Sequence, residues 1–175
     1  MNTFRSEIYS AMNPFLRRLE EALGKLPNHP NPKTTGFYLA HIHTDTKILS
    51  AEKIGTILEE NEYLYLNLAA KKVTETLRFG KKRSAEFADE KIGRYPGAVS
   101  HLGYCAGVAG HDDPLIDEAI ALLWILAYEL HCQSTYPNPM EDEIFWTCMI
   151  VRAKTYQKCE HLENPWIDTI AILLM

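Results

Sequence analysis

The sequence has few cysteines, and they are not grouped. Cys105, Cys132, Cys148 and Cys159 are the four in its 175 residues, and no C-x-x-C pair occurs among them. This spacing excludes a zinc ribbon and a thioredoxin-like redox motif. We therefore expect free thiols, as in a reducing intracellular compartment.

Long apolar runs are absent as well. The longest, residues 119–128 and 170–175, fall well short of the roughly 18 residues that a membrane-spanning helix requires. Charged residues and Pro14 interrupt the apolar residues near the N-terminus, which excludes the apolar core of a signal peptide. A soluble, cytoplasmic protein without a membrane partner is expected.

Positive charge is in the minority. The 18 Lys and Arg residues face 23 Asp and Glu residues, which gives a net charge of −5 with neutral histidines. Nucleic acids and anionic membranes bind clustered positive charge, so we expect neither as a partner. The basic run at residues 81–83 is the local exception, and a solvated loop is its simplest interpretation.

The rest of the composition is that of a globular protein. Hydrophobic residues make up 46% and charged residues 23%, which excludes a disordered chain. Apolar residues at three- and four-residue spacing predict helices, and apolar alternation predicts strands. The expected helices cover residues 14–25, 60–78 and 114–132. The expected strands form two hairpins, over residues 36–54 and over residues 98–109.

Local signals refine three of these elements. Asn13-Pro14 and Asp113-Pro114 are each interpreted as the N-cap and first residue of a helix. The helix over residues 114–132 is apolar on almost every side, so we expect it to be covered on more than one side. In the helix over residues 60–78 the buried stripe is expected at Leu66, Ala70, Val73 and Leu77. Its flanks and outer face are expected to carry Lys71, Lys72 and Glu75.

The order of the elements predicts the fold class. Antiparallel strand pairs separated by helices are typical of an α+β protein with one sheet and helices packed on it. We expect an N-terminal helix and proline-rich linker over residues 1–34, a core domain over 35–133 and a C-terminal extension over 134–175. Within the extension, residues 144–151 fit either a helix or a strand.

One glycine-rich stretch invites a phosphate-loop interpretation. Residues 97–114 read GAVSHLGYCAGVAGHDDP, without the G-K-[ST] of a Walker loop or the G-x-G-x-x-G of a dinucleotide site. We therefore interpret its glycines as residues of turns and close packing.

Three stretches of the sequence together carry a family resemblance. LAHIHTDTKILSAEKIGT (39–56) has a strand, a polar turn, a second strand and a glycine exit, and NLAAKKVTETLRFGKKRSAEF (67–87) has a lysine-bearing helix that ends in Phe-Gly. The third, 97–118, places glycines before a helix that opens with acidic residues. Over residues 35–129 the chain thus resembles the GlcG-like or haem-degrading-domain family, nearest its uncharacterised cytoplasmic branch. The resemblance implies a profilin-like sheet, a homo-oligomer and a small-molecule ligand such as haem.

Two histidines on one strand form a candidate site. In His41-Ile42-His43 the alternation places both imidazoles on one face, about 6.6 Å apart at a rise near 3.3 Å per residue. Such a pair can hold a metal ion with further ligands, which His101, His111, Asp112 or Asp113 could supply if the strands are neighbours. Two hydrogen-bonded or part-exposed strand histidines are the alternative.

Haem requires a different set of side chains. One neutral imidazole can serve as the axial ligand, and basic side chains can meet the propionates. The candidates are His41, His43, His101 and His111 as axial ligand, and Lys72, Arg78 and Arg83 at the propionates. For Lys72 and Arg78 a solvated or salt-bridged position on the helix is the alternative.

Three hypotheses of function follow. The first is a small-ligand-binding or sensory module, for haem or another tetrapyrrole. The second is an enzyme, either metal-dependent through His41 and His43 or a thiol enzyme through Cys105 with His111 as its base. The third is a homo-oligomeric structural or partner-binding protein assembled through the apolar helix 114–132.

Overall fold

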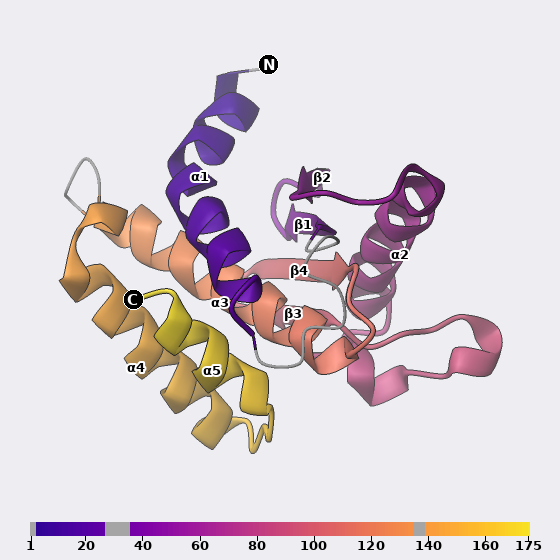
Figure 1. The fold of residues 1–175 in the computed structure, drawn as a ribbon. Coiled ribbons are helices and arrows are strands. Elements are labelled where there is room, and N and C mark those ends of the chain that lie inside the picture. Colours follow the sequence, from indigo (N-terminus) through magenta and orange to yellow (C-terminus); the bar gives the residue numbers. More distant parts are fainter. Residues whose placement is uncertain (1–2, 27–35, 135–138) are drawn as a thin grey trace.

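The computed structural model describes residues 3–26, 36–134 and 139–175 and contains one sheet with helices on both of its faces (Figure 1). The helices are α1 (Thr3–Leu23), α2 (Glu59–Arg78), α3 (Pro114–Gln133), α4 (Glu143–Cys159) and α5 (Pro165–Leu173). The strands are β1 (Phe37–His43), β2 (Leu49–Ile54), β3 (Ala98–His101) and β4 (Tyr104–Ala109). Short 3₁₀ turns are η1 (Ser84–Phe87), η2 (Glu90–Ile92) and η3 (Pro139–Glu141).

The sheet consists of two hairpins, β1–β2 and β3–β4, which are joined by the pairing of β1 with β4. Its order is β2-β1-β4-β3, and every neighbouring pair is antiparallel. Tyr38 lies opposite Ala109 and His43 opposite Tyr104, so β1 and β4 run the full length of the centre of the sheet. The predicted α+β class, with an antiparallel sheet and helices packed on it, is confirmed.

The sheet separates two layers of helix (Figure 1). Helix α2 packs on one face, where Val73 contacts a small core that includes Ala40 and Cys105. Helix α3 packs on the other face, over the side chains of Leu39 and Val108. The remaining helices, α1, α4 and α5, pack on α3. The C-terminal segment is thereby joined to the core through α3.

Helix α3 begins where its sequence predicts. Asp113 caps it by accepting a hydrogen bond from the backbone N–H of Leu115 at 2.9 Å, and Pro114 occupies its first turn. Its middle is buried on all sides, because the sheet covers one face and α1, α4 and α5 cover the rest. The apolar surface that suggested an oligomer interface is therefore covered within one chain. No helix of the described residues is both long and apolar enough to cross a membrane.

Helix α1 differs from the prediction. Pro14 lies inside a continuous helix and does not start a new one after a turn. Proline there costs one backbone hydrogen bond, but Pro14 is exposed while Phe15 and Leu19 on the opposite side are fully buried. Packing of that apolar face offsets the lost bond. Beyond residue 26, the proline-rich linker lies outside the described residues.

The C-terminal segment forms two helices. Residues 144–151, for which helix and strand were both open, belong to α4. Its buried residues follow a helical period: Phe145, Trp146, Met149, Ala153 and Tyr156. Asn164 caps α5 by accepting from the backbone N–H of Trp166 at 3.0 Å.

Candidate functional site

A cavity of about 340 Å³ lies at the end of the sheet where β4 leads into α3. Three segments wall it: the middle of α2, the loop that follows η2, and the β4–α3 connection. Its charged, polar and aromatic lining side chains are Tyr65, Lys72, Glu90, Tyr95, His111, Asp112 and Asp117. A cavity of this size, with aromatic walls and a few polar groups, is typical of small-molecule sites.

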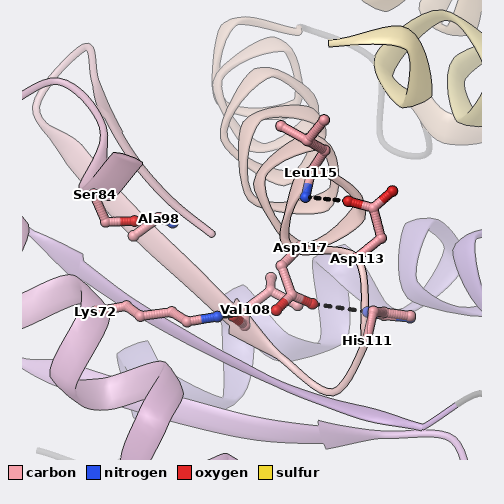
Figure 2. Close-up of polar contacts among 8 residues, drawn as sticks. All are labelled: Lys72, Ser84, Ala98, Val108, His111, Asp113, Leu115 and Asp117. Atoms are coloured by element: carbon pink, nitrogen blue, oxygen red, sulfur yellow. Dashed lines mark hydrogen bonds and ion pairs between the residues drawn. The ribbon is translucent and has the colours of Figure 1, made fainter. Parts of the chain in front are cut away.

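A buried ion pair lies in the wall of this cavity. The ammonium nitrogen of Lys72 lies 2.9 Å from Oδ2 of Asp117 and also donates to the carbonyl of Val108 at 2.6 Å. The two charged side chains are 6% and 3% exposed. Figure 2 shows Lys72 reaching Asp117 from α2. Each charge is compensated by the other, as burial at this depth requires.

His111 completes the cluster from the opposite side of Asp117 (Figure 2). Its Nδ1 lies 2.8 Å from Oδ1 of Asp117, its side chain is 3% exposed, and its ring packs on Phe37 with centroids 5.6 Å apart. An ionised carboxylate can only accept, so Nδ1 carries the hydrogen. The Asp117 carboxylate therefore fixes the tautomer and the orientation of the imidazole.

The electrostatics of Asp117 favour its ionised form. Burial raises the pKa of this carboxyl. The Lys72 ammonium and the hydrogen bond from His111 lower the pKa by more than burial raises it, so the net shift is downward. Asp117 also lies in the first turn of α3, where the helix dipole favours a negative charge.

Gly97 makes room for the ion pair. A Cβ atom at this position would lie 2.7 Å from Cβ of Asp117 and 2.8 Å from Nζ of Lys72. Its φ of +115° is also a backbone conformation that other residues rarely adopt. Glycine at 97 thus lets β3 begin directly against the Lys72–Asp117 contact.

Negative charge extends from Asp117 into the cavity. Burial raises the pKa of the Tyr65 phenol, and the carboxylates of Asp112 and Asp117 raise it further. Tyr65 and both acids line the cavity. A phenol in this field keeps its proton and stays a hydrogen-bond donor at neutral pH.

The strand histidines lie elsewhere. His41 and His43 do share one face of β1, as the alternation predicts, but that face carries α3. The His41 ring packs on Trp124 with centroids 4.4 Å apart, and its Nε2 lies 3.8 Å from Glu52. His43 packs on the edge of Tyr104.

The four predicted histidines do not converge. The His101 ring packs on Tyr156 of α4, and burial lowers its pKa. His43 pairs with Tyr104 at the start of β4, whereas His111 follows the other end of that strand. Within the described ranges, no three His, Cys, Asp or Glu side chains are arranged to hold a metal ion. The haem and metal hypotheses remain predictions from the sequence.

The three basic candidates contact different partners. Lys72 is buried in the ion pair, so its predicted position toward the outer side of α2 is wrong, and the salt-bridged alternative describes it. Arg78 lies at the exposed end of α2, with its guanidinium 5.7 Å from the centroid of Phe79. Arg83 lies between α2 and η1, with its guanidinium 3.8 Å from the carboxylate of Glu118.

Cys105 lies on the α2 face of the sheet and is fully buried. Burial raises the pKa of its thiol to about 12, and the S–H donates to the carbonyl of Val73 at 3.7 Å. At neutral pH such a thiol is almost entirely protonated and a poor nucleophile. The geometry gives the thiol-enzyme hypothesis no support.

Comparison with known proteins adds no relative. No family model, curated protein or solved structure matches this chain. The resemblance to the GlcG-like family therefore stays a prediction, and the site is interpreted from its own geometry.

Sequence reasoning missed Asp117, Tyr65 and Tyr95 as site residues. Asp117 was visible only as a helix-opening acid, the usual surface role of such a residue. The available signal was its position in the first turn of a helix that is apolar on almost every side, where an acid is buried and needs a cationic partner.

Proposed function

We propose that the protein is a small-molecule-binding module whose site is the cavity between α2 and the start of α3. One observation carries this: the buried Lys72–Asp117–His111 cluster lies in the wall of a cavity large enough for a small organic molecule. Buried charges cost free energy of folding even when they are paired. Groups of this kind concentrate at functional sites.

A second hollow, of about 460 Å³, offers a comparison. It lies where α4 leads into α5, and its charged lining is exposed, as at Lys154, Lys158 and Asp168. Solvated charges on a helix surface need no ligand to explain them. The proposal therefore favours the cavity at Lys72.

A thermal-shift screen of small molecules tests the proposal. A compound present at 100 times its Kd stabilises the fold by about 2.7 kcal/mol, which raises Tm by about 5 °C or more. We expect Leu68→Trp, which fills the cavity, to abolish the shift. Leu64→Trp, one turn earlier on α2 and exposed, is the matched control and should preserve it.

Tyr95→Ala provides a second variant if Leu68→Trp fails to fold. Tyr95 is 39% exposed and lines the cavity, so its loss should weaken binding without loss of the fold. Hits whose Tm shifts persist in both cavity variants would overturn the proposed site.

We also propose that the protein forms a homo-oligomer and is located in the cytoplasm. Since α3 is covered within the chain, an oligomer would use another surface. Light scattering tests it: a particle of 20.0 kDa at high concentration would contradict an oligomer.

A further inference from the structure

The cavity at Lys72 carries an excess of negative charge. Three carboxylates, those of Glu90, Asp112 and Asp117, line it together with one ammonium, that of Lys72, which leaves two negative charges in excess. If His111 is protonated, the excess falls from two negative charges to one. Asp117 is already paired with Lys72, so the uncompensated charge belongs to Glu90 and Asp112, whose side chains are exposed.

The nearby cations are directed to other partners. Lys71 donates to the carbonyl of Gly93 at 2.7 Å. The guanidinium of Arg94 lies 4.8 Å from the centroid of Phe79 and 3.8 Å from Glu75. Neither Lys71 nor Arg94 lines the cavity, and the charged side chains that do line it sum to a negative charge.

Two tyrosines add a second attraction for positive charge. Tyr65 lines the cavity from α2 and Tyr95 from the loop after η2. Aromatic rings attract ammonium groups through their negative faces, and desolvation strengthens the contact. Because the pKa of Tyr65 is raised, this ring stays uncharged at neutral pH.

We infer that the ligand of this cavity is a small organic cation, an ammonium compound held by Glu90 and Asp112 and packed against Tyr65 and Tyr95. The inference rests on the proposed function and specifies its ligand. Anions are disfavoured, because Asp112 and Asp113 precede α3 and repel them from its N-terminus. A neutral compound of equal shape gains the apolar contacts but not the electrostatic attraction.

Matched pairs of probes separate charge from shape. Choline and its neutral carbon analogue 3,3-dimethylbutan-1-ol form a small pair, and benzyltrimethylammonium and neopentylbenzene form a larger one. Each is titrated into ¹⁵N-labelled protein at low salt, with amide shifts followed at Gly110, His111 and Tyr95. We expect one cation to bind at least tenfold more tightly than its neutral partner.

Variants assign the preference to the cavity. Glu90→Gln with Asp112→Asn should weaken cation binding about five- to tenfold and leave the neutral partner unchanged. Asp45→Asn with Glu141→Gln removes the same charge from exposed positions elsewhere and should change neither. Tyr95→Leu should weaken cation binding about threefold or more, while Tyr95→Phe retains it.

The outcomes distinguish the two proposals. Equal affinity for the members of each pair, or tighter binding of an anion such as phosphate, overturns the cationic ligand and leaves the small-molecule site standing. If no compound of any charge in the probes or the screen shifts the cavity residues, the proposed function itself is overturned.

Discussion

Nζ of Lys72 lies 2.9 Å from Oδ2 of Asp117, although 45 positions of the sequence separate the two residues. The contact joins the two helices on opposite faces of the sheet, α2 and α3, at the end where β4 leads into α3. The contact therefore links α2 to α3 and also forms part of the wall of the cavity.

Loss of both partners of the Lys72–Asp117 pair should cost less than the sum of the two single losses. Lys72→Met leaves the buried Asp117 carboxylate with His111 but without its ammonium, and should lower the free energy of unfolding by about 3 to 5 kcal/mol. Asp117→Asn should also destabilise the protein. In urea unfolding, the double variant should lose clearly less than the sum of the two single losses. Additive losses would show that the pair is not coupled.

Gly97→Ala should be costly for two reasons that can be separated. The new Cβ would meet Asp117 and Lys72 below 3 Å, and the backbone has φ of +115°. Strain of this kind costs about 1 to 3 kcal/mol before the clash is added. Gly80→Ala is the control, since Gly80 also has a positive φ but a Cβ atom added there would have no other atom within 4 Å. Equal losses in the two variants would mean that the clash at Gly97 is relieved at no cost.

Glu118→Gln should change how stability depends on pH. Burial raises the pKa of Glu118 and outweighs the Arg83 guanidinium and the Asn164 amide, which lower it, while Glu86 raises it again. The folded state then binds this proton more tightly than the unfolded state, so stability falls as pH rises from about 4.5, the usual pKa, through the raised value.

Glu118→Gln removes that proton. In urea unfolding between pH 4 and 7, the variant should therefore lose less stability than the native protein over the same rise in pH. Glu141→Gln is the control, because Glu141 is exposed and is not among the groups that shift the pKa of Glu118. Parallel pH profiles for Glu118→Gln and the native protein would contradict the raised pKa.

Alkylation of the native protein should spare one thiol. Cys132, Cys148 and Cys159 are exposed, whereas Cys105 is buried with its pKa raised to about 12. With iodoacetamide at pH 8, mass spectrometry should find three modified sites, and Cys105 should react only after unfolding. Rapid modification of Cys105 in the folded protein would revive the thiol-enzyme hypothesis.

The fold was largely predictable because its signals are local. Asp113-Pro114 caps a helix through contacts within one turn, and the alternation around His41 needs only the neighbouring strand. The same Asx-Pro pattern failed at Pro14, where packing of the distant face of α1 decides the outcome. Asn164-Pro165 follows the rule and begins α5.

The site was less predictable because its contacts are long-range. Apolar spacing predicted the buried face of α2 at Leu66, Ala70, Val73 and Leu77, but of these only Val73 is buried. The other buried residues of this helix are Ala69, Lys72 and Thr76. A lysine is buried only when a carboxylate from elsewhere meets it, and the spacing within α2 contains no information about Asp117. His111 was identified as a candidate, but its partner is the same carboxylate and not the other histidines.

The crystal structure of the protein with the tightest compound from the screen tests the central claim most directly. The account predicts the compound in the cavity at the end of the sheet, against Tyr65 and Tyr95, with the Lys72–Asp117 contact retained behind it. The account would be contradicted if the compound were bound elsewhere, as in the hollow between α4 and α5, and the cavity at Lys72 did not contain it.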